Sequence, residues 1–161
     1  MTINVGDKIP SVTLKQLTPE GVKEFTTDDI FRGKKVVLFA VPGAFTPTCH
    51  LKHLPGFIES ADDFKKHGVD RVVCIAVNDP FVLAAWEEKS GGGEKVLFLS
   101  DGNAEFTKKI GMDFDGSGFG LGRRSKRYSA LVEDGVVKIL NVEESPAVAE
   151  ASTASRILQS L

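Results

Sequence analysis

Long apolar runs without polar interruption mark the central strands that this sequence predicts. Runs of mainly β-branched and other large apolar side chains are typical of strands buried on both faces of a sheet. The Asp134-Gly135 pair favours a tight hairpin between the last two strand patterns. The predicted strands are 34–41, 71–77, 96–99, 127–133 and 136–142.

Helical patterns are predicted at 49–67, at 80–90, in a short segment that ends at Ile110, and at 147–161. Asp79 is a suitable N-cap for the second helix, because Pro80 then takes the first helical position. Pro55-Gly56 predicts a kink in the first helix. Asp101 or Asn103 is expected to cap the short helix. The glycine-rich segment 116–122 predicts a flexible loop.

The order of these elements indicates the fold class. Strands alternate with helices, and a hairpin and a closing helix follow, which predicts an α/β protein: a thioredoxin-like three-layer α/β/α sandwich with a mixed central sheet. We expect a single domain over 1–161. The loop after the 34–41 strand then lies at the carboxyl edge of the sheet, where α/β proteins build their sites.

Composition narrows the classes of function. The chain has 161 residues, of which 42% are hydrophobic and 26% charged, and its net charge is −2. This balance favours neither a nucleic-acid partner nor an anionic membrane surface. No run of about 20 apolar residues predicts a membrane span. The start of the sequence has no basic segment followed by an apolar one, so we expect a cytoplasmic protein, with a mature organellar form as the alternative.

The chain has only two cysteines, which argues against a disulfide scaffold and favours a reducing compartment. Cys49 stands where the 34–41 strand and a Gly/Pro turn lead into a helix. A thiol in the first turn of a helix lies among unpaired backbone N–H groups, at the positive end of the helix dipole. Both favour the thiolate, which is the reactive form. The local sequence therefore predicts a nucleophile.

Pro42-x-x-x-Thr46-x-x-Cys49 resembles the peroxidatic motif of the peroxiredoxins. The longer stretches 41–49 and 53–57, the segment 77–82 and the segment 124–129 are similar to the type II, peroxiredoxin-5-like branch, and the similarity covers essentially the whole chain. It implies a thiol-dependent peroxidase that reduces hydrogen peroxide and alkyl hydroperoxides. It also implies a homodimer and no bound cofactor or metal; Phe45 and Phe81 are candidate dimer contacts.

The resemblance implies a role for each residue of the motif. Cys49 would attack the peroxide and become a sulfenic acid. Thr46 would place its hydroxyl beside the sulfur, and Pro42 would shield it from water. The family's distant arginine corresponds to Arg127, whose guanidinium stays charged and offers planar donors to thiolate and peroxide. The expected rim of the substrate pocket comprises Gly43, Phe45, Thr48 and Phe119.

A second thiol must reduce the sulfenate, and here the sequence departs from part of the family. Segment 141–161 has no resolving cysteine, so Cys74 is the only candidate in the chain. Cys74 stands inside the apolar run 71–77, where a structural role is the main expectation. A disulfide needs Cα atoms within about 7 Å, so pairing would require the Cys49 helix to unwind. Glutathione with glutaredoxin, or thioredoxin, is the simpler reductant.

Other interpretations of the same residues were weighed. Cys49 with His50 and His53 is a weak metal signal, because no further ligand cluster is present. A Cys–His hydrolase would need a third, orienting residue. The basic run 123–127 is more typical of a solvated face than of a nucleic-acid patch. The alternative function is a peroxide sensor or thiol relay, which would pass the oxidation to a partner instead of turning over.

Overall fold

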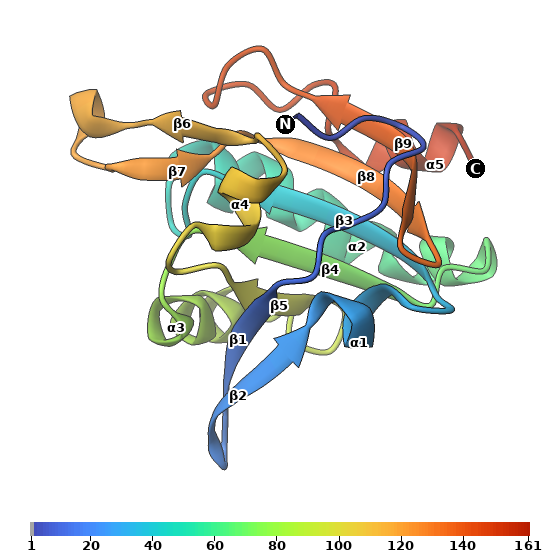
Figure 1. The fold of residues 1–161 in the computed structure, drawn as a ribbon, viewed down its shortest axis with the longest axis horizontal. Coiled ribbons are helices and arrows are strands. Elements are labelled where there is room, and N and C mark those ends of the chain that lie inside the picture. The colour runs from blue at the N-terminus through green and yellow to red at the C-terminus, as the bar shows by residue number, and fades with distance from the viewer. Residues whose placement is uncertain (1) are drawn as a thin grey trace.

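The computed structural model describes residues 2–161 and centres on a seven-stranded mixed sheet with the order β2-β1-β5-β4-β3-β8-β9 (Figure 1). Its strands are β1 (Thr13–Thr18), β2 (Gly21–Thr26), β3 (Lys35–Val41), β4 (Arg71–Ala76), β5 (Leu97–Ser100), β8 (Tyr128–Glu133) and β9 (Val136–Val142). A separate two-stranded hairpin consists of β6 (Asp113–Asp115) and β7 (Arg123–Ser125). The expected mixed sheet is present, and the hairpin expected at Asp134-Gly135 is formed by β8 and β9. The β6–β7 hairpin was not expected.

The three middle strands of the sheet, β3, β4 and β5, run parallel to one another, while β8 pairs antiparallel with β3. From Val36 to Val41 every residue of β3 is buried, which explains its continuous apolar sequence. The carboxyl end of β3 lies beside the start of β8, because Ala40 pairs with Tyr128. Two segments far apart in the sequence therefore meet at this edge.

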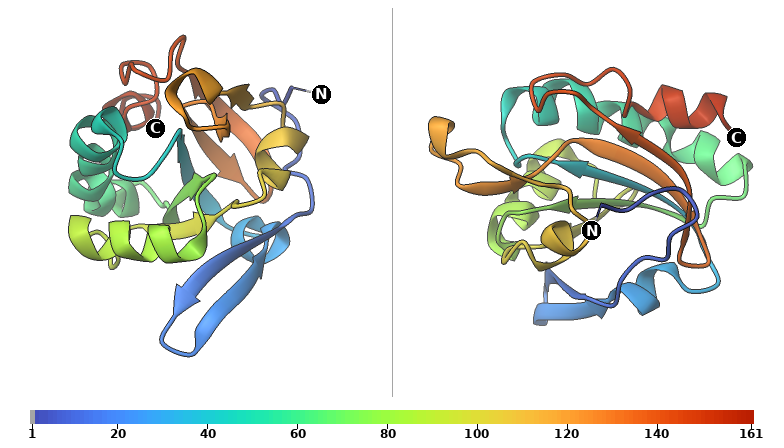
Figure 2. Two further views of the ribbon diagram at one scale, coloured as in Figure 1. Left: turned by 90° about the vertical axis from the view of Figure 1, so that its left-hand side faces the viewer. Right: turned by 45° about the horizontal axis from the view of Figure 1, so that its top comes forward.

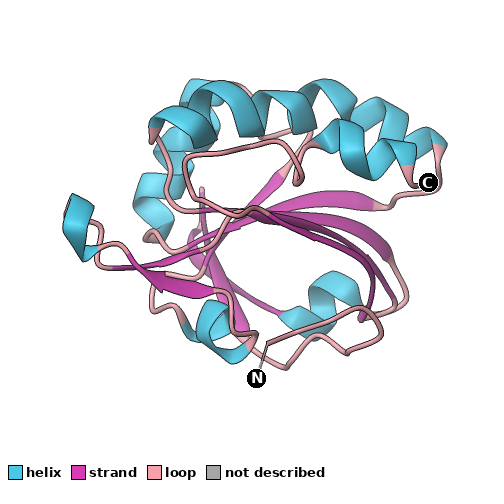
Figure 3. Ribbon diagram, turned by 90° about the horizontal axis from the view of Figure 1, so that it is seen from above, coloured by secondary structure: helices cyan, strands magenta, loops and turns pink. Residues whose placement is uncertain are grey.

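Helices cover both faces of the sheet and form three layers (Figures 2 and 3). One face carries α2 (Leu54–Lys66), α3 (Pro80–Ser90) and α5 (Ala154–Gln159), and the other carries α1 (Thr27–Phe31) and α4 (Glu105–Lys109). Each face has its own apolar core. The first core contains Phe57, Phe64 and Trp86, and the second contains Phe31 and Phe106. This three-layer arrangement agrees with the expected α/β/α sandwich.

The helix expected at 49–67 is divided in two. Cys49–His53 forms a π-helical turn, in which the N–H of Leu54 bonds to the carbonyl of Cys49, and α2 follows from Leu54. Pro55 has no N–H to donate, and it stands in the first turn of α2, where an α-helix leaves donors unpaired. The expected irregularity thus occurs as a wide turn before Pro55.

Two helix starts differ from the sequence-based expectation. Ala104, in the left-handed region at φ 57°, occupies the N-cap position of α4. The carboxylate of Asp101 nevertheless accepts the N–H groups of Phe106 and Thr107 at 3.0 and 2.8 Å. The closing helix begins at Ala154 instead of 147, because residues 143–152 form a loop held by their own hydrogen bonds. The additional elements β1, β2 and α1 lie before Lys34, where the sequence pattern predicts none.

The segment 116–122 is the turn of the β6–β7 hairpin, with a 3-10 turn at Ser117–Phe119. This hairpin projects from the body of the molecule (Figure 1).

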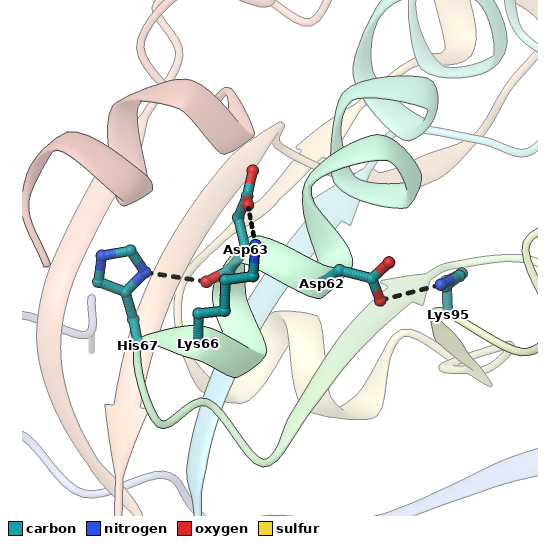
Figure 4. A network of polar contacts seen from close by, with 5 residues as sticks. All are labelled: Asp62, Asp63, Lys66, His67 and Lys95. Carbon is teal, nitrogen blue, oxygen red and sulfur yellow. Dashed lines mark hydrogen bonds and ion pairs between the residues drawn. The ribbon is translucent and has the colours of Figure 1, made fainter.

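At the C-terminal end of α2, Lys95 pairs with Asp62 at 2.9 Å, and the ring of His67 bonds to the carbonyl of Asp63 (Figure 4). Within residues 2–161, none of the helices combines the length and apolar character that crossing a membrane requires.

The expected N-cap of α3 is confirmed, since Asp79 Oδ1 accepts the N–H of Val82 at 2.8 Å. Replacing Asp79 by Ala leaves this N–H without its partner, so we predict a loss of about 1 kcal/mol in the free energy of unfolding. Asp79→Asn keeps an acceptor and should lose little. Urea unfolding of the three proteins tests this, and equal losses in both variants would contradict a capping role.

Candidate active site

Cys49 lies at the start of the π-helical turn, directly after the loop that leaves β3. Its side chain is completely buried, with 0% exposure, and it belongs to the apolar core under α2. The Sγ atom accepts a hydrogen bond from Arg127 Nη2 at 2.9 Å. A buried sulfur that is held by a guanidinium is a far more specific arrangement than a core cysteine packed among apolar side chains.

Arg127 is 2% exposed and lies in the short connection between β7 and β8, one residue before the strand on which it was expected. Its Nη1 bonds to His53 Nδ1 at 2.9 Å. Its Nε and Nη2 donate to the carbonyl of Pro146 at 3.3 and 3.0 Å. In the described part of the chain, Arg127 forms no salt bridge with a carboxylate. Because a buried charge needs a partner, the guanidinium is well placed to stabilise a thiolate.

His53 is the main residue of the site whose role the sequence analysis missed. The sequence offered His53 only as part of a weak metal signal, and in the structure its ring contacts Phe39 and Phe57 edge-on. However, its Nε2 also faces the carbonyl of Ser152 at 3.0 Å. A carbonyl only accepts, so Nε2 carries the proton and Nδ1 is the acceptor for Arg127. The i, i+4 spacing from Cys49 was the available signal, because it places both side chains on one helix face.

Burial lowers the pKa of His53 to about 4, and the hydrogen bond to Ser152 only partly opposes this effect, while Arg127 adds to it. The imidazole is therefore neutral at physiological pH. A protonated ring would carry hydrogen on both nitrogens and could no longer accept from Arg127. The neutral state of His53 is thus a condition for the observed position of the guanidinium.

Three hydrogen bonds hold the loop before Cys49 in place. Asn78 Oδ1 accepts the N–H of Ala44 at 2.9 Å, and the hydroxyl of Thr46 donates to the carbonyl of Gly43 at 2.7 Å. The buried Pro42 accepts from Arg124 Nη1 at 3.1 Å through its carbonyl. A Cβ on Gly43 would lie 2.5 Å from the same nitrogen, so the close approach of Arg124 requires glycine here.

The other expected site residues divide into two groups. Thr48 donates its hydroxyl to the carbonyl of Ala147 at 3.1 Å, and Phe45 is 45% exposed beside the ring of His50, at φ 63°. Both belong to the neighbourhood of Cys49. Phe119, in contrast, is 86% exposed in the turn of the projecting β6–β7 hairpin. Arg124 links this turn to the loop before Cys49, because it donates to the carbonyls of Leu121 and Pro42 at 3.0 and 3.1 Å. The place of Phe119 at the pocket rim stays a prediction.

Cys74 lies inside β4 and is buried in the same apolar core as Cys49. Both cysteines are free. Burial raises the pKa of the Cys74 thiol, the nearby Cys49 adds to the effect, and Arg127 opposes it. Cys74 is therefore a poor nucleophile in the folded state. Residues 2–161 contain no group of three or more His, Cys, Asp or Glu side chains that could hold a metal ion.

The comparisons with known proteins give the family. A family model described as Redoxin matches residues 4–158. Peroxiredoxin-2B of Arabidopsis thaliana is 42% identical over 160 residues, with 99% of this chain and 98% of the relative covered. The chain belongs to the peroxiredoxins. The chloroplastic peroxiredoxin-2E of the same plant is 50% identical over 155 residues, which cover 94% of this chain and 66% of that relative.

Solved structures agree with this assignment. Reduced Prx3 of Vibrio vulnificus, in complex with H2O2, is 49% identical, with a TM-score of 0.93 and 99% of both chains covered. Peroxiredoxin 5 of Alvinella pompejana is 37% identical with a TM-score of 0.86, and 98% of this chain and 97% of that chain are covered. These similarities confirm the expected peroxiredoxin fold, and the chain is a thiol-dependent peroxidase.

The state of His53 predicts a pH dependence of stability in this peroxiredoxin. Above pH 6.5 the imidazole is neutral in the folded and unfolded chains and contributes nothing. As the pH falls from 6.5 toward 4, only the unfolded chain takes up the proton, so stability is lost. We predict that wild type loses about 3 kcal/mol more than His53→Gln over this window.

Urea unfolding of both proteins between pH 7 and pH 4 measures this difference. The exposed His67, at the far end of α2, supplies a matched control, and His67→Gln should follow wild type. Parallel pH profiles for wild type and His53→Gln would show that the folded protein does not keep His53 neutral.

Proposed function

We propose that this peroxiredoxin reduces hydrogen peroxide and alkyl hydroperoxides through Cys49, with Arg127, Thr46 and Pro42 around the reacting sulfur. The observation that carries the proposal is the 2.9 Å hydrogen bond from Arg127 Nη2 to the buried Cys49 Sγ. It places a permanent positive charge beside the nucleophile, in a site from which water is excluded. Electrostatic stabilisation is strongest in such surroundings.

The reaction requires one bond to form while another breaks. The Cys49 thiolate attacks the terminal oxygen of the peroxide, so the S–O bond forms and the O–O bond breaks. The sulfur becomes a sulfenic acid, and the leaving alkoxide or hydroxide takes up a proton to give alcohol or water. Negative charge moves from sulfur to oxygen during this step. Arg127 offers several N–H donors in one plane, so it can serve the sulfur and the peroxide oxygens together.

Thr46 is suited to hold the peroxide in line. Its hydroxyl proton is engaged by the carbonyl of Gly43 at 2.7 Å, which leaves its oxygen lone pairs free to accept. The attacked peroxide oxygen carries a hydrogen atom, and Thr46 Oγ1 can accept a hydrogen bond from it. Pro42 cannot donate through its backbone, and its carbonyl is bound to Arg124 at 3.1 Å. Pro42 would therefore shield the sulfur without competing for the substrate.

For the second half of the cycle we propose an external thiol, either glutathione with glutaredoxin or thioredoxin. Cys74 is buried in β4, which is paired on both sides by β3 and β5. Moving it toward Cys49 would break two strand ladders. Opening the short Cys49–His53 turn toward solvent disturbs far fewer hydrogen bonds. Both thiols are free, which supports a reducing compartment, either the cytoplasm or the interior of an organelle.

We also propose that the protein forms a homodimer close to the active-site loop. Phe45 is 45% exposed and Phe81, at the start of α3, is 61% exposed. Large apolar side chains at the surface are typical of contact residues. Sedimentation of wild type and Phe81→Asp tests this proposal, since the added charge should shift the protein toward the monomer. A monomeric wild type would contradict it.

Cys49→Ser should abolish peroxide turnover, because the oxygen nucleophile forms no sulfenic acid. Thr46→Val removes one hydroxyl at nearly constant volume, and we predict a rate about 100-fold lower. Steady-state consumption of hydrogen peroxide with saturating reductant measures both variants. Residual turnover of Cys49→Ser through Cys74 would contradict the assignment of the nucleophile.

Cys74→Ser distinguishes the possible reductants. With glutathione and glutaredoxin, we predict that wild type and Cys74→Ser turn over at similar rates, because Cys74 has a structural role. If thioredoxin supported the turnover of wild type and Cys74→Ser did not turn over, Cys74 would be the resolving thiol. The same experiment tests the alternative function, since a peroxide sensor would consume one equivalent of peroxide and then stop.

A further inference from the structure

The loop of residues 143–152, called here the 143–152 loop, connects β9 to the turn before α5 and folds around the carboxylate of Glu143. Glu143 Oε2 accepts the N–H groups of Glu150 and Ser152 at 2.9 and 2.6 Å, and the Ser152 hydroxyl at 2.6 Å. Its Oε1 accepts the N–H of Ala151 at 3.1 Å. The side chain of the first residue of the loop therefore holds the last three residues of the loop by hydrogen bonds.

Glu143 has no basic partner in the described part of the chain. Burial by itself raises the pKa of its carboxyl, but the hydrogen bonds from Ser152, Ala151 and Glu150 outweigh burial and lower it. Glu143 is only 8% exposed, so little water is available to replace these donors. Its charge is stabilised almost entirely by the loop that it holds.

The closed loop presents three carbonyl groups to the active site. The carbonyl of Pro146 accepts from Arg127 Nε and Nη2 at 3.3 and 3.0 Å. The carbonyl of Ala147 accepts the hydroxyl of Thr48 at 3.1 Å. The carbonyl of Ser152 faces His53 Nε2 at 3.0 Å. The guanidinium of Arg127 is thus attached to the loop twice, directly through Pro146 and indirectly through His53.

We propose that Glu143 is a positioning residue for peroxide reduction, which acts by holding the 143–152 loop so that Pro146 and Ser152 orient Arg127 toward Cys49. The inference rests on the proposed function of Cys49 and Arg127. The geometry favours a specific role over general stabilisation, because the carbonyls that the loop directs inward bind Arg127, its partner His53, and Thr48 beside the nucleophile. Small displacements of a group that stabilises a transition state have large effects on rate.

The test follows the reaction of the reduced protein with hydrogen peroxide in a Cys74→Ser background, where Cys49 is the only thiol. Loss of that thiol in rapidly quenched samples gives the rate constant of the first step. Glu143→Gln replaces one acceptor oxygen by a donor that opposes the loop N–H groups. We predict a rate constant about 10-fold lower, whereas Glu144→Gln, at an exposed neighbouring position, should match the parent protein.

A double-mutant cycle with Arg127→Gln separates positioning from a merely structural role. If Glu143 acts through Arg127, Glu143→Gln should slow the reaction strongly in the parent and hardly at all in the Arg127→Gln background. An equal factor in both backgrounds, or no effect of Glu143→Gln at all, would overturn the proposal. A reaction that Arg127→Gln does not slow would instead contradict the proposed role of Arg127.

Ser152→Ala provides a second variant in case Glu143→Gln folds poorly. It removes the hydroxyl that donates to Glu143 and that lies 3.2 Å from His53 Nε2, and it keeps the Ser152 carbonyl that faces His53. We predict a loss of a few-fold that likewise disappears in the Arg127→Gln background. A rate unchanged from the parent in a well-folded Ser152→Ala protein would count against the loop as the positioning element.

Discussion

A guanidinium buried without a carboxylate partner is the constraint on which the rest of the site depends. Arg127 is almost inaccessible to solvent, and all its observed partners are neutral carbonyls, a neutral imidazole and the Cys49 sulfur. Burying a lone charge costs several kcal/mol unless a counter-charge compensates it. In the proposed reaction a thiolate at Cys49 would supply that compensation, and its sulfur lies 2.9 Å from Arg127 Nη2. The same pairing requires His53 to stay neutral, because a second cation there would face the guanidinium.

The mixed sheet brings the two groups together across 78 residues of sequence. Cys49 follows the carboxyl end of β3, and Arg127 directly precedes β8, which is the antiparallel neighbour of β3. Because the end of one strand lies beside the start of the other, short connections are enough to bring sulfur and guanidinium into contact. His53 completes the arrangement from the next turn after Cys49. The remaining contacts of Arg127 come from the 143–152 loop, which Glu143 closes.

This arrangement also explains why the two halves of the catalytic cycle make opposite demands on the structure. A small peroxide reacts best where water is excluded and the donors are fixed, as in the closed site. In the proposed cycle an external thiol would have to reach a sulfur that has 0% exposure, which would require the Cys49–His53 turn to open. Opening breaks contacts of Cys49 with Arg127, of His53 with Ser152 and of Thr48 with Ala147. The π-helical turn comprises only Cys49–His53 and precedes Pro55 in the first turn of α2.

Local sequence by itself determined the strands at 34–41 and 71–77, the α3 helix with its Asp79 cap and the fold class, and it predicted Cys49 as the nucleophile. These features depend on apolar runs, caps and turns within a few residues of one another, or on a contiguous motif. It also led to Arg127, although only through resemblance to a family, since nothing local distinguishes the inward arginine from Arg124. It did not lead to the π-helical turn or the late start of α5, and the place of Phe119 at the pocket rim stays a prediction.

Only the tertiary structure decided the partners of Arg127. Nothing in the local sequence distinguishes His53, Ser152, Pro146 or Glu143. They come together because the sheet, the π-helical turn and the 143–152 loop meet around the guanidinium of Arg127. The physical reason is that a hydrogen bond depends on distance and direction in space, whereas propensity and periodicity describe neighbours along the chain. The sequence therefore predicts which thiol is the nucleophile, and the folded structure determines which groups hold Arg127 beside it.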